Sequence, residues 1–110
     1  MKVELLYIED CPNSDEAYAR LRAAVSDVAG PGIDVVRTVV LDATGAPAFA
    51  GSPTITLDGV DLFPGATPVN ELSCRIYQTP DGLAGLPTQE QIKKSLQNRG
   101  VSPGRRRMAS

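Results

Sequence analysis

Residues 2 to 14 read KVELLYIEDCPNS, and this stretch carries the strongest indications of both fold and chemistry. Residues 2 to 8 are nearly continuous in apolar and β-forming side chains, which is typical of a strand buried on both faces. Cys11 then stands where the strand gives way to a helical pattern. A thiol there faces unpaired backbone N–H groups and the positive end of a helix dipole, and both favour the thiolate. We therefore predict a central strand followed by a site for thiol chemistry.

The residues after Cys11 predict a β-α-β unit. From residue 14 to residue 29 apolar side chains recur at helical spacing, and the Gly-Pro-Gly run at residues 30 to 32 ends this pattern. Residues 33 to 41 are rich in valine and predict a second strand. A helix between two such strands usually makes a right-handed parallel crossover, so we expect the two strands to be parallel.

The next part of the chain predicts a β-hairpin. Residues 54 to 57 and 60 to 63 flank Asp58-Gly59, and this pair tolerates the positive φ angles that a type I′ turn needs. Ahead of the hairpin, Gly45 and Pro47 interrupt any long helix. We therefore expect a short helical turn or a loop over residues 42 to 50.

The last part of the chain predicts a loop and a helix. Residues 64 to 87 are rich in Pro, Gly and Thr and are expected to form a long loop, which in a small domain tends to be functional. Residues 88 to 91 read TQEQ, a capping box that opens a helix through about Asn98. We expect Ile92 and Leu96 of this helix to face the core. The predicted domain covers residues 1–99, and residues 100–110 are expected to be a disordered basic tail.

Composition narrows the class of protein. The 110 residues suffice for one core, and the formal net charge of -2 argues against a nucleic-acid binder with a broad basic face. The basic run at residues 105 to 107 is too short to indicate nucleic acid. No apolar stretch approaches the roughly 20 residues of a membrane helix, and no signal-peptide pattern follows Met1. We expect a cytoplasmic protein that binds neither nucleic acid nor membranes.

The cysteine and histidine counts limit the chemistry. The chain has two cysteines, Cys11 and Cys74, and no histidine. A chain of this length without a signal sequence does not need a structural disulfide, so we expect both thiols to be reduced at rest. Imidazole catalysis and histidine-ligated zinc are excluded, and two cysteines cannot complete a four-ligand zinc site. We expect no cofactor and no resident metal.

The predicted order of elements is that of a minimal thioredoxin fold, and the chain resembles the thioredoxin-like superfamily over residues 2–98. It also resembles small bacterial thioredoxin-like proteins, some of which carry an alkylmercury lyase label. The matching motifs are Cys11-Pro12-Asn13, Gly51-Ser52-Pro53-Thr54 and Ser73-Cys74-Arg75-Ile76-Tyr77. The resemblance implies an α/β fold with one mixed sheet and helices on both faces.

The resemblance also assigns roles to residues. It implies that Pro53 is cis and stands across from Cys11, with Ser52 and Thr54 where substrate approaches; taken alone, Pro53 only marks a loop ahead of a strand. Ser14 stands where a thioredoxin places its resolving cysteine, so no disulfide can form within the Cys-x-x-Ser motif. Monothiol glutaredoxins share this spacing, but Glu9 replaces their lysine and Pro-Gly-Ala at residues 64 to 66 replaces their glutathione-binding turn.

Several side chains have two interpretations. Glu9 and Asp10 oppose the thiolate that the helix terminus favours. Cys74 has one structural and one functional interpretation. It is a small buried apolar residue, or it is a functional thiol that acts as a resolving thiol or as a soft-metal ligand. Ser14 is predicted to be an N-terminal helix cap rather than a nucleophile, because no base is available to activate it. Arg75 is either a positive charge for a thiolate, placed where substrate approaches, or a solvated loop residue.

The sequence thus predicts thiol-disulfide chemistry. Cys11 is the expected attacking thiolate, Pro53 shapes substrate approach, and Cys74 is the candidate resolving thiol. The expected partner is a protein or small-molecule thiol or disulfide. Two alternatives stay open: a soft-metal or organomercurial binder that uses Cys11 and Cys74, and a non-catalytic thioredoxin-like binding module. Whether the chain is an enzyme, and its oligomeric state, are left open.

Overall fold

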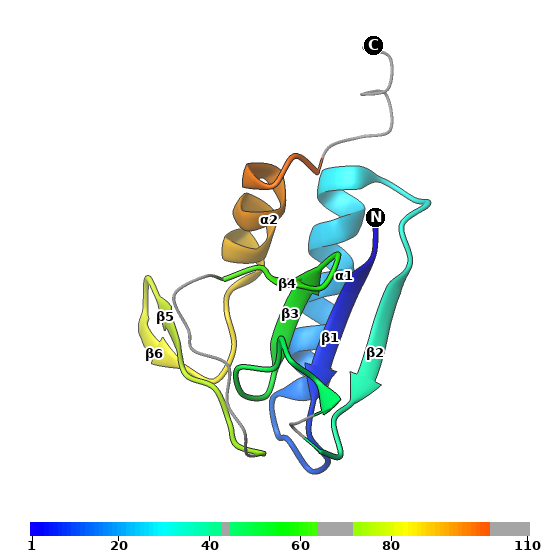
Figure 1. Ribbon diagram of the computed structural model, residues 1–110. Helices are drawn as coiled ribbons and strands as arrows, with labels where there is room; N and C mark the ends of the chain where they lie inside the picture. The colour runs from blue at the N-terminus through cyan, green and yellow to red at the C-terminus, as the bar shows by residue number, and fades with distance from the viewer. Residues whose placement is uncertain (43–44, 64–71, 102–110) are drawn as a thin grey trace.

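The fold centres on a four-stranded mixed sheet with the strand order β2-β1-β3-β4. The computed structural model describes residues 1–42, 45–63 and 72–101. The strands of this sheet are β1 (Val3–Tyr7), β2 (Val35–Val39), β3 (Thr54–Leu57) and β4 (Val60–Asp61). β1 runs parallel to β2 and antiparallel to β3, as Figure 1 shows. The predictions of a central first strand and of a parallel second strand are therefore confirmed.

Both described helices pack on one face of this sheet. They are α1 (Ser14–Ala29) and α2 (Gln89–Asn98). The same hydrophobic core joins Leu21 of α1 and Leu96 of α2 to Val3, Leu5 and Ile55 of the sheet. The expectation of helices on both faces is wrong for the residues that the structure describes, because alternate residues of β1 and β3 meet both helices on the same side.

The opposite face of the sheet carries a smaller cluster. Leu6, Val40 and Phe49 are buried there, and Ile8 and Ala46 pack against them. Phe49 belongs to the segment after β2, where the backbone makes turns at the described positions, as predicted for residues 42 to 50. Leu6 and Ile8 point to the same face of the sheet. The cluster therefore packs against Ile8, which lies just ahead of Cys11 in the chain.

Two local predictions from the sequence are confirmed. Asp58 and Gly59 have φ angles of 52° and 84°, as the turn between β3 and β4 requires. At the start of α2, the Gln91 N–H donates to Thr88 Oγ1 at 3.1 Å, and the Thr88 N–H donates to Gln91 Oε1 at 2.9 Å. This is the reciprocal pair of a capping box. In both places the residues concerned are close together in the sequence.

The predicted long loop over residues 64 to 87 is wrong in its second part. The structure has a second, two-stranded sheet there, formed by β5 (Tyr77–Thr79) and β6 (Gly82–Ala84). These strands are too short and too polar to show an alternating pattern in the sequence. Residues 64 to 71 lie outside the described residues.

The folded part of the chain extends beyond the predicted boundary at residue 99. The Val101 N–H donates to the Leu96 carbonyl oxygen at 3.0 Å, and Val101 is 2% exposed within the core. The rest of the predicted basic tail, residues 102 to 110, lies outside the described residues. In the described ranges, neither helix has the length and apolar character needed to cross a bilayer.

Candidate functional site

Cys11 lies in the turn that joins β1 to α1. The turn reverses at Asp10, whose φ angle of 61° is one that aspartate tolerates better than most residues. The Cys11 N–H donates to the Ile8 carbonyl oxygen at 3.3 Å. Cys11 is 9% exposed, whereas Glu9, Asp10 and Pro12 around it are exposed. The thiol therefore belongs to a tight turn with acidic residues on its outer side.

The start of α1 differs from the prediction by one residue. Asn13, not Ser14, is the N-cap residue, and its side chain makes no capping hydrogen bond. Ser14 is the first helical residue, and its hydroxyl donates to the Cys11 carbonyl oxygen at 3.3 Å. The prediction of Ser14 as the cap is wrong because this hydroxyl donates backward to the turn and accepts nothing from the helix amides. Its position ties Cys11 to the first turn of α1.

Ser52 connects the segment ahead of Cys11 to the rest of the site. The Ser52–Pro53 peptide bond is cis, as the resemblance implies for Pro53. Ser52 is 0% exposed, and its Oγ accepts the Ile8 N–H at 3.1 Å. Thr54, which was expected where substrate approaches, is buried, and its hydroxyl accepts the Ala50 N–H and donates to the Gly51 carbonyl oxygen. Thr54 therefore braces the turn that carries the cis bond.

Residues 72 to 77, called here the Cys74 segment, run alongside Ser52. Ser52 and Cys74 form a parallel β-bridge in which the Ser52 N–H donates to the Ser73 carbonyl oxygen at 2.8 Å. The Arg75 N–H in turn donates to the Ser52 carbonyl oxygen at 2.9 Å. Cys74 itself is exposed with a free thiol. The interpretation of Cys74 as a buried apolar residue is therefore wrong.

Arg75 holds the Cys74 segment against the hairpin of β3 and β4. Its Nη1 lies 2.8 Å from Asp61 Oδ2, and its Nη2 donates to the Phe63 carbonyl oxygen at 2.9 Å. The guanidinium carbon lies 4.5 Å from the centre of the Tyr77 ring. Because Arg75 is 7% exposed, the interpretation as a solvated loop residue is wrong. Its charge is matched by Asp61, so it is not a free cation for a thiolate.

Tyr77 is a site residue that the sequence did not single out beyond its place in a motif. Its hydroxyl donates to the Pro53 carbonyl oxygen, and its ring meets Phe63 edge-on with 5.4 Å between the ring centres. Burial raises the pKa of the Tyr77 hydroxyl above its ordinary value. The hydroxyl therefore keeps the proton that it donates to the residue after Ser52.

Arg37 was also missed, since an arginine within a valine-rich strand carries no motif. Its Nη2 lies 2.5 Å from Asp15 Oδ1 and 3.4 Å from Ser14 Oγ. Its guanidinium lies over the rings of Tyr7 and Tyr18. The hydrogen bond to Asp15 raises the pKa of Arg37, so this cation stays charged. It fastens β2 to the first turn of α1.

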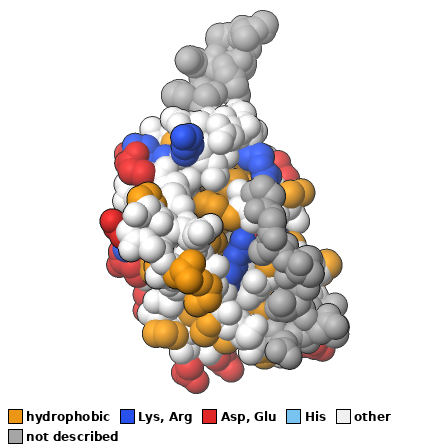
Figure 2. All heavy atoms as spheres, turned by 90° about the vertical axis from the view of Figure 1, so that its left-hand side faces the viewer, with side chains coloured by type: hydrophobic (Ala, Val, Ile, Leu, Met, Phe, Trp, Pro, Cys, Tyr) orange, Lys and Arg blue, Asp and Glu red, His pale blue; other side chains and the backbone are white. Residues whose placement is uncertain are grey.

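The segment after β6 closes on the motif from another side. A Cβ atom placed on Gly85 would lie 2.1 Å from Asn13 Nδ2, so a side chain at this position would have to displace the Asn13 side chain. Figure 2 shows the face that carries the β5–β6 hairpin, where hydrophobic side chains gather. Ile76, just ahead of β5, and Leu83 in β6 are strongly exposed apolar residues. The motif with Cys11 is thus bordered by the Ser52 turn and by residues next to this hairpin.

The structure thus links four of the predicted residues, Cys11 among them through Ile8. Cys11 bonds to Ile8, Ile8 bonds to Ser52, and Ser52 is bridged to Cys74 and joined to Pro53 by the cis bond. Within residues 1–42, 45–63 and 72–101, no three side chains of His, Cys, Asp or Glu gather as a metal site would require.

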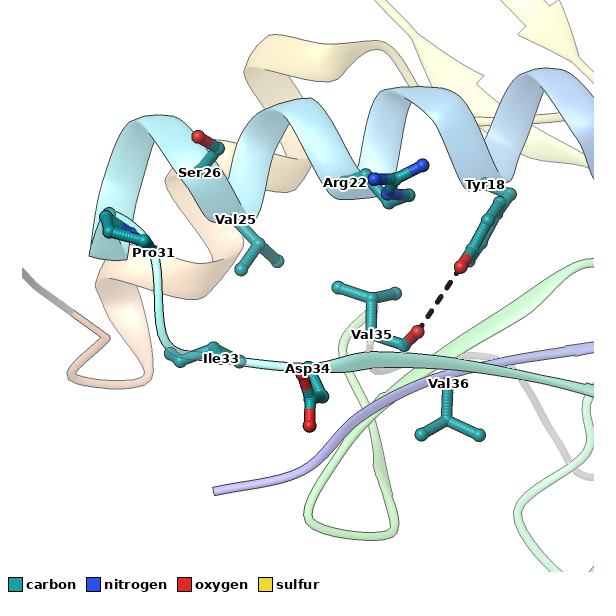
Figure 3. Close-up of a pocket in the computed structure, with 10 residues that line it drawn as sticks. Tyr18, Arg22, Val25, Ser26, Pro31, Ile33, Asp34, Val35 and Val36 are labelled. Carbon is teal, nitrogen blue, oxygen red and sulfur yellow. Dashed lines mark hydrogen bonds between the residues drawn. The ribbon is translucent and has the colours of Figure 1, made fainter.

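A separate hollow of about 620 Å³ lies between α1 and the start of β2. Figure 3 shows Tyr18, Arg22 and Val25 of α1 facing Ile33 and Val35, with the Tyr18 hydroxyl donating to the Val35 carbonyl oxygen at 3.4 Å. Cys11 and the Ser52 turn do not line it. The hollow is therefore distinct from the thiol site.

Comparison with known proteins found no matching family model, no similar curated protein and no similar solved structure.

Proposed function

We propose that this chain is a thioredoxin-like thiol-disulfide exchange protein in which Cys11 attacks and Cys74 resolves. The order of elements supports the thioredoxin-like part of the proposal: a β-α-β unit, a cis-proline turn, a hairpin and a terminal helix. The chemical part is carried by one observation. Ser52 bonds to the turn of Cys11 through Ile8 and to the Cys74 segment through its own backbone.

The contacts around Ser52 make an exchange between the two cysteines plausible in geometry. Paired residues of neighbouring strands lie close together, and here the pair is Ser52 and Cys74. The Cys11 turn is joined to the Ser52 side chain through Ile8, whose N–H donates to Ser52 Oγ and whose carbonyl oxygen accepts the Cys11 N–H. Cys11 is 9% exposed and Cys74 is exposed, so attack by Cys11 requires a disulfide that can reach its small accessible surface, whereas the thiol of Cys74 is open to solvent.

The proposed reaction balances with the two thiols alone. The Cys11 thiolate attacks one sulfur of a disulfide, forms a mixed disulfide and releases the first thiolate. The Cys74 thiolate then attacks the Cys11 sulfur, forms the Cys11–Cys74 disulfide and releases the second thiolate. The protein loses two electrons and the substrate disulfide gains two. A small thiol can run both steps in reverse and restore the reduced protein.

The two other functions make different demands on the same residues. A soft-metal binder needs both thiols to hold one ion without any exchange. A binding module needs neither thiol, so its partner affinity survives Cys11→Ser. No observation in the described residues favours either over exchange.

Trapping the mixed disulfide tests the proposal. Reduced Cys74→Ser protein is treated with bis(2-hydroxyethyl) disulfide, and intact mass is followed over time beside wild type and Cys11→Ser. We expect Cys74→Ser to accumulate one adduct at Cys11, wild type to pass on to an adduct-free mass lower by two hydrogens, and Cys11→Ser to keep any adduct at Cys74 unresolved. Stable adducts at both cysteines of wild type would contradict the proposal.

A further inference from the structure

The backbone of Ser52 is already occupied by the chain's own residues. An exposed sheet edge binds an extended peptide through pairs of backbone N–H and carbonyl groups. At Ser52 the N–H is donated to Ser73 and the carbonyl oxygen accepts from Arg75, while the side chain accepts from Ile8. The Cys74 segment therefore lies where an incoming polypeptide strand would pair beside the cis-proline turn.

The Cys74 segment is held there by buried contacts. The ion pair between Arg75 and Asp61 and the hydroxyl of Tyr77 on Pro53 fasten it at two points. A Cβ atom on Gly51 would lie only 2.8 Å from Arg75 Cβ, so the segment also packs tightly on the turn itself. A polypeptide could pair with Ser52 only by displacing these contacts.

The motif around Cys11 is closed to bulky groups and bordered by negative charge. Cys11 is 9% exposed, and Gly85 packs directly on Asn13. Glu9 and Asp10 are exposed beside it. The two arginines that bond to site residues are each paired with an aspartate, Arg37 with Asp15 and Arg75 with Asp61.

From these contacts we infer the substrate class of the proposed site: it takes low-molecular-weight disulfides that are neutral or cationic, and it excludes disulfides carried on extended polypeptides. The inference rests on the proposed exchange function. A small disulfide reaches Cys11 without displacing the Cys74 segment, and Cys74 then resolves the mixed disulfide from its place beside Ser52. Anionic disulfides are repelled by the carboxylates of Glu9 and Asp10.

Matched disulfide reagents test the inference on the full chain. Because Cys74 is exposed and can react first, access to Cys11 is measured in reduced Cys74→Ser protein, where Cys11 is the remaining thiol. This protein is treated with cystamine, with bis(2-hydroxyethyl) disulfide, with dithiodiglycolate, and with the disulfide-linked dimer of a short neutral peptide with a central cysteine, and the Cys11 adduct is followed by intact mass. Each rate is divided by the rate of the same reagent with free N-acetylcysteine. We expect the peptide dimer to be slower than bis(2-hydroxyethyl) disulfide by about tenfold or more, because it must break the backbone bonds of Ser52. We expect cystamine to be fastest and dithiodiglycolate to be slower than the neutral reagent.

Variants separate occlusion from general loss of structure. Arg75→Gln loosens the Cys74 segment, and Lys93→Gln is the control, because it removes the same charge from a half-buried lysine on α2 that pairs with Asp27 and Glu90. Tyr77→Phe removes only the hydroxyl that bonds to Pro53, and it replaces Arg75→Gln in the test if that variant does not fold. We expect Arg75→Gln or Tyr77→Phe to raise the peptide rate relative to the small-disulfide rate, and Lys93→Gln to leave this ratio unchanged.

The outcomes distinguish failure of the inferred substrate class from failure of the proposed exchange function. Equal normalised rates for the peptide dimer and the small disulfides would overturn the inference while leaving exchange intact. A preference for dithiodiglycolate would overturn the charge selectivity. If no reagent forms the Cys11–Cys74 disulfide in wild-type protein, the proposed function itself fails, and the substrate class fails with it.

Discussion

Ser52 and Cys74 form a single parallel β-bridge, so the residue before the cis-proline is paired with the residue that carries the exposed thiol. The bridge joins parts of the chain that no local pattern connects. It also explains why the Ser52 turn is braced from both sides, by Ile8 of the β1 end and by the backbone of the Cys74 segment. The arrangement makes Ser52 the structural centre of the site.

The hydroxyl of Ser52 should therefore matter for stability. Ser52→Ala leaves the Ile8 N–H without its acceptor, and an unsatisfied buried donor costs about 1–3 kcal/mol. We expect this loss in the free energy of unfolding measured with urea. Ser26→Ala, at an exposed helical position, is the control and should change it by less than about 0.5 kcal/mol. Equal effects of the two substitutions would show that the Ser52 hydroxyl does not brace the turn.

The buried ion pair gives a second prediction. Arg75→Gln removes the cation from Asp61, which keeps the Phe63 N–H as its donor, and breaking a pair that is buried on the Arg75 side costs about 3 kcal/mol. The exposed pair of Arg20 and Glu16 is the comparison, and Glu16→Gln, which leaves the Arg20 bond to the Pro87 carbonyl oxygen intact, should cost well under that amount. Urea denaturation of both variants measures the difference. A loss for Arg75→Gln no larger than for Glu16→Gln would mean that the pair does not anchor the Cys74 segment.

Two glycines separate backbone strain from steric contact. Gly51 and Gly30 both have positive φ, at 108° and 75°, so alanine is strained at either position. Only Gly51 is crowded, because its Cβ would meet Arg75, while a Cβ at Gly30 meets nothing within 4 Å. We expect Gly51→Ala to destabilise the protein by about 1–3 kcal/mol more than Gly30→Ala. Similar values for both would show that the Cys74 segment yields easily.

Tyr77 makes stability depend on alkaline pH. The folded state raises the pKa of this hydroxyl, so it holds the proton more tightly than the unfolded chain does. This contribution is complete below the unfolded pKa of about 10 and is lost as pH rises above it toward the folded value. We expect the free energy of unfolding to fall between pH 9 and pH 11, that is, within about one unit of the unfolded pKa. The fall should be steeper in wild type than in Tyr77→Phe. Parallel pH profiles for the two proteins would refute this role.

Much of the fold was predictable because its signals are local. The helix over residues 14 to 29, the Asp58-Gly59 turn and the capping box at Thr88 each depend on neighbours in the sequence, and the structure has all of them. The parallel pairing of β1 and β2 followed from the helix between them. The cis bond at Pro53 followed from the resemblance.

The parts that could not be predicted depend on distant contacts. Arg75 is buried because Asp61 and Phe63 receive its guanidinium, and nothing near residue 75 in the sequence indicates them. The β5–β6 hairpin is too short to show a strand pattern. Both helices lie on one face of the sheet because the segment after β2 covers the other face. There Val40 and Phe49 pack on Leu6. The helix cap lies at Asn13, one residue before the predicted Ser14, because the Ser14 hydroxyl donates to the Cys11 carbonyl oxygen.

The central claim is that Cys11 and Cys74 form a disulfide with one another within a single chain. Dilute wild-type protein is oxidised with bis(2-hydroxyethyl) disulfide, its free thiols are blocked, and its peptides are mapped by mass spectrometry without reduction. The account predicts a linked peptide pair containing Cys11 and Cys74 in monomeric protein, and reversal of the link by a small thiol. A Cys74–Cys74 link between chains, or two cysteines that never join, would contradict it.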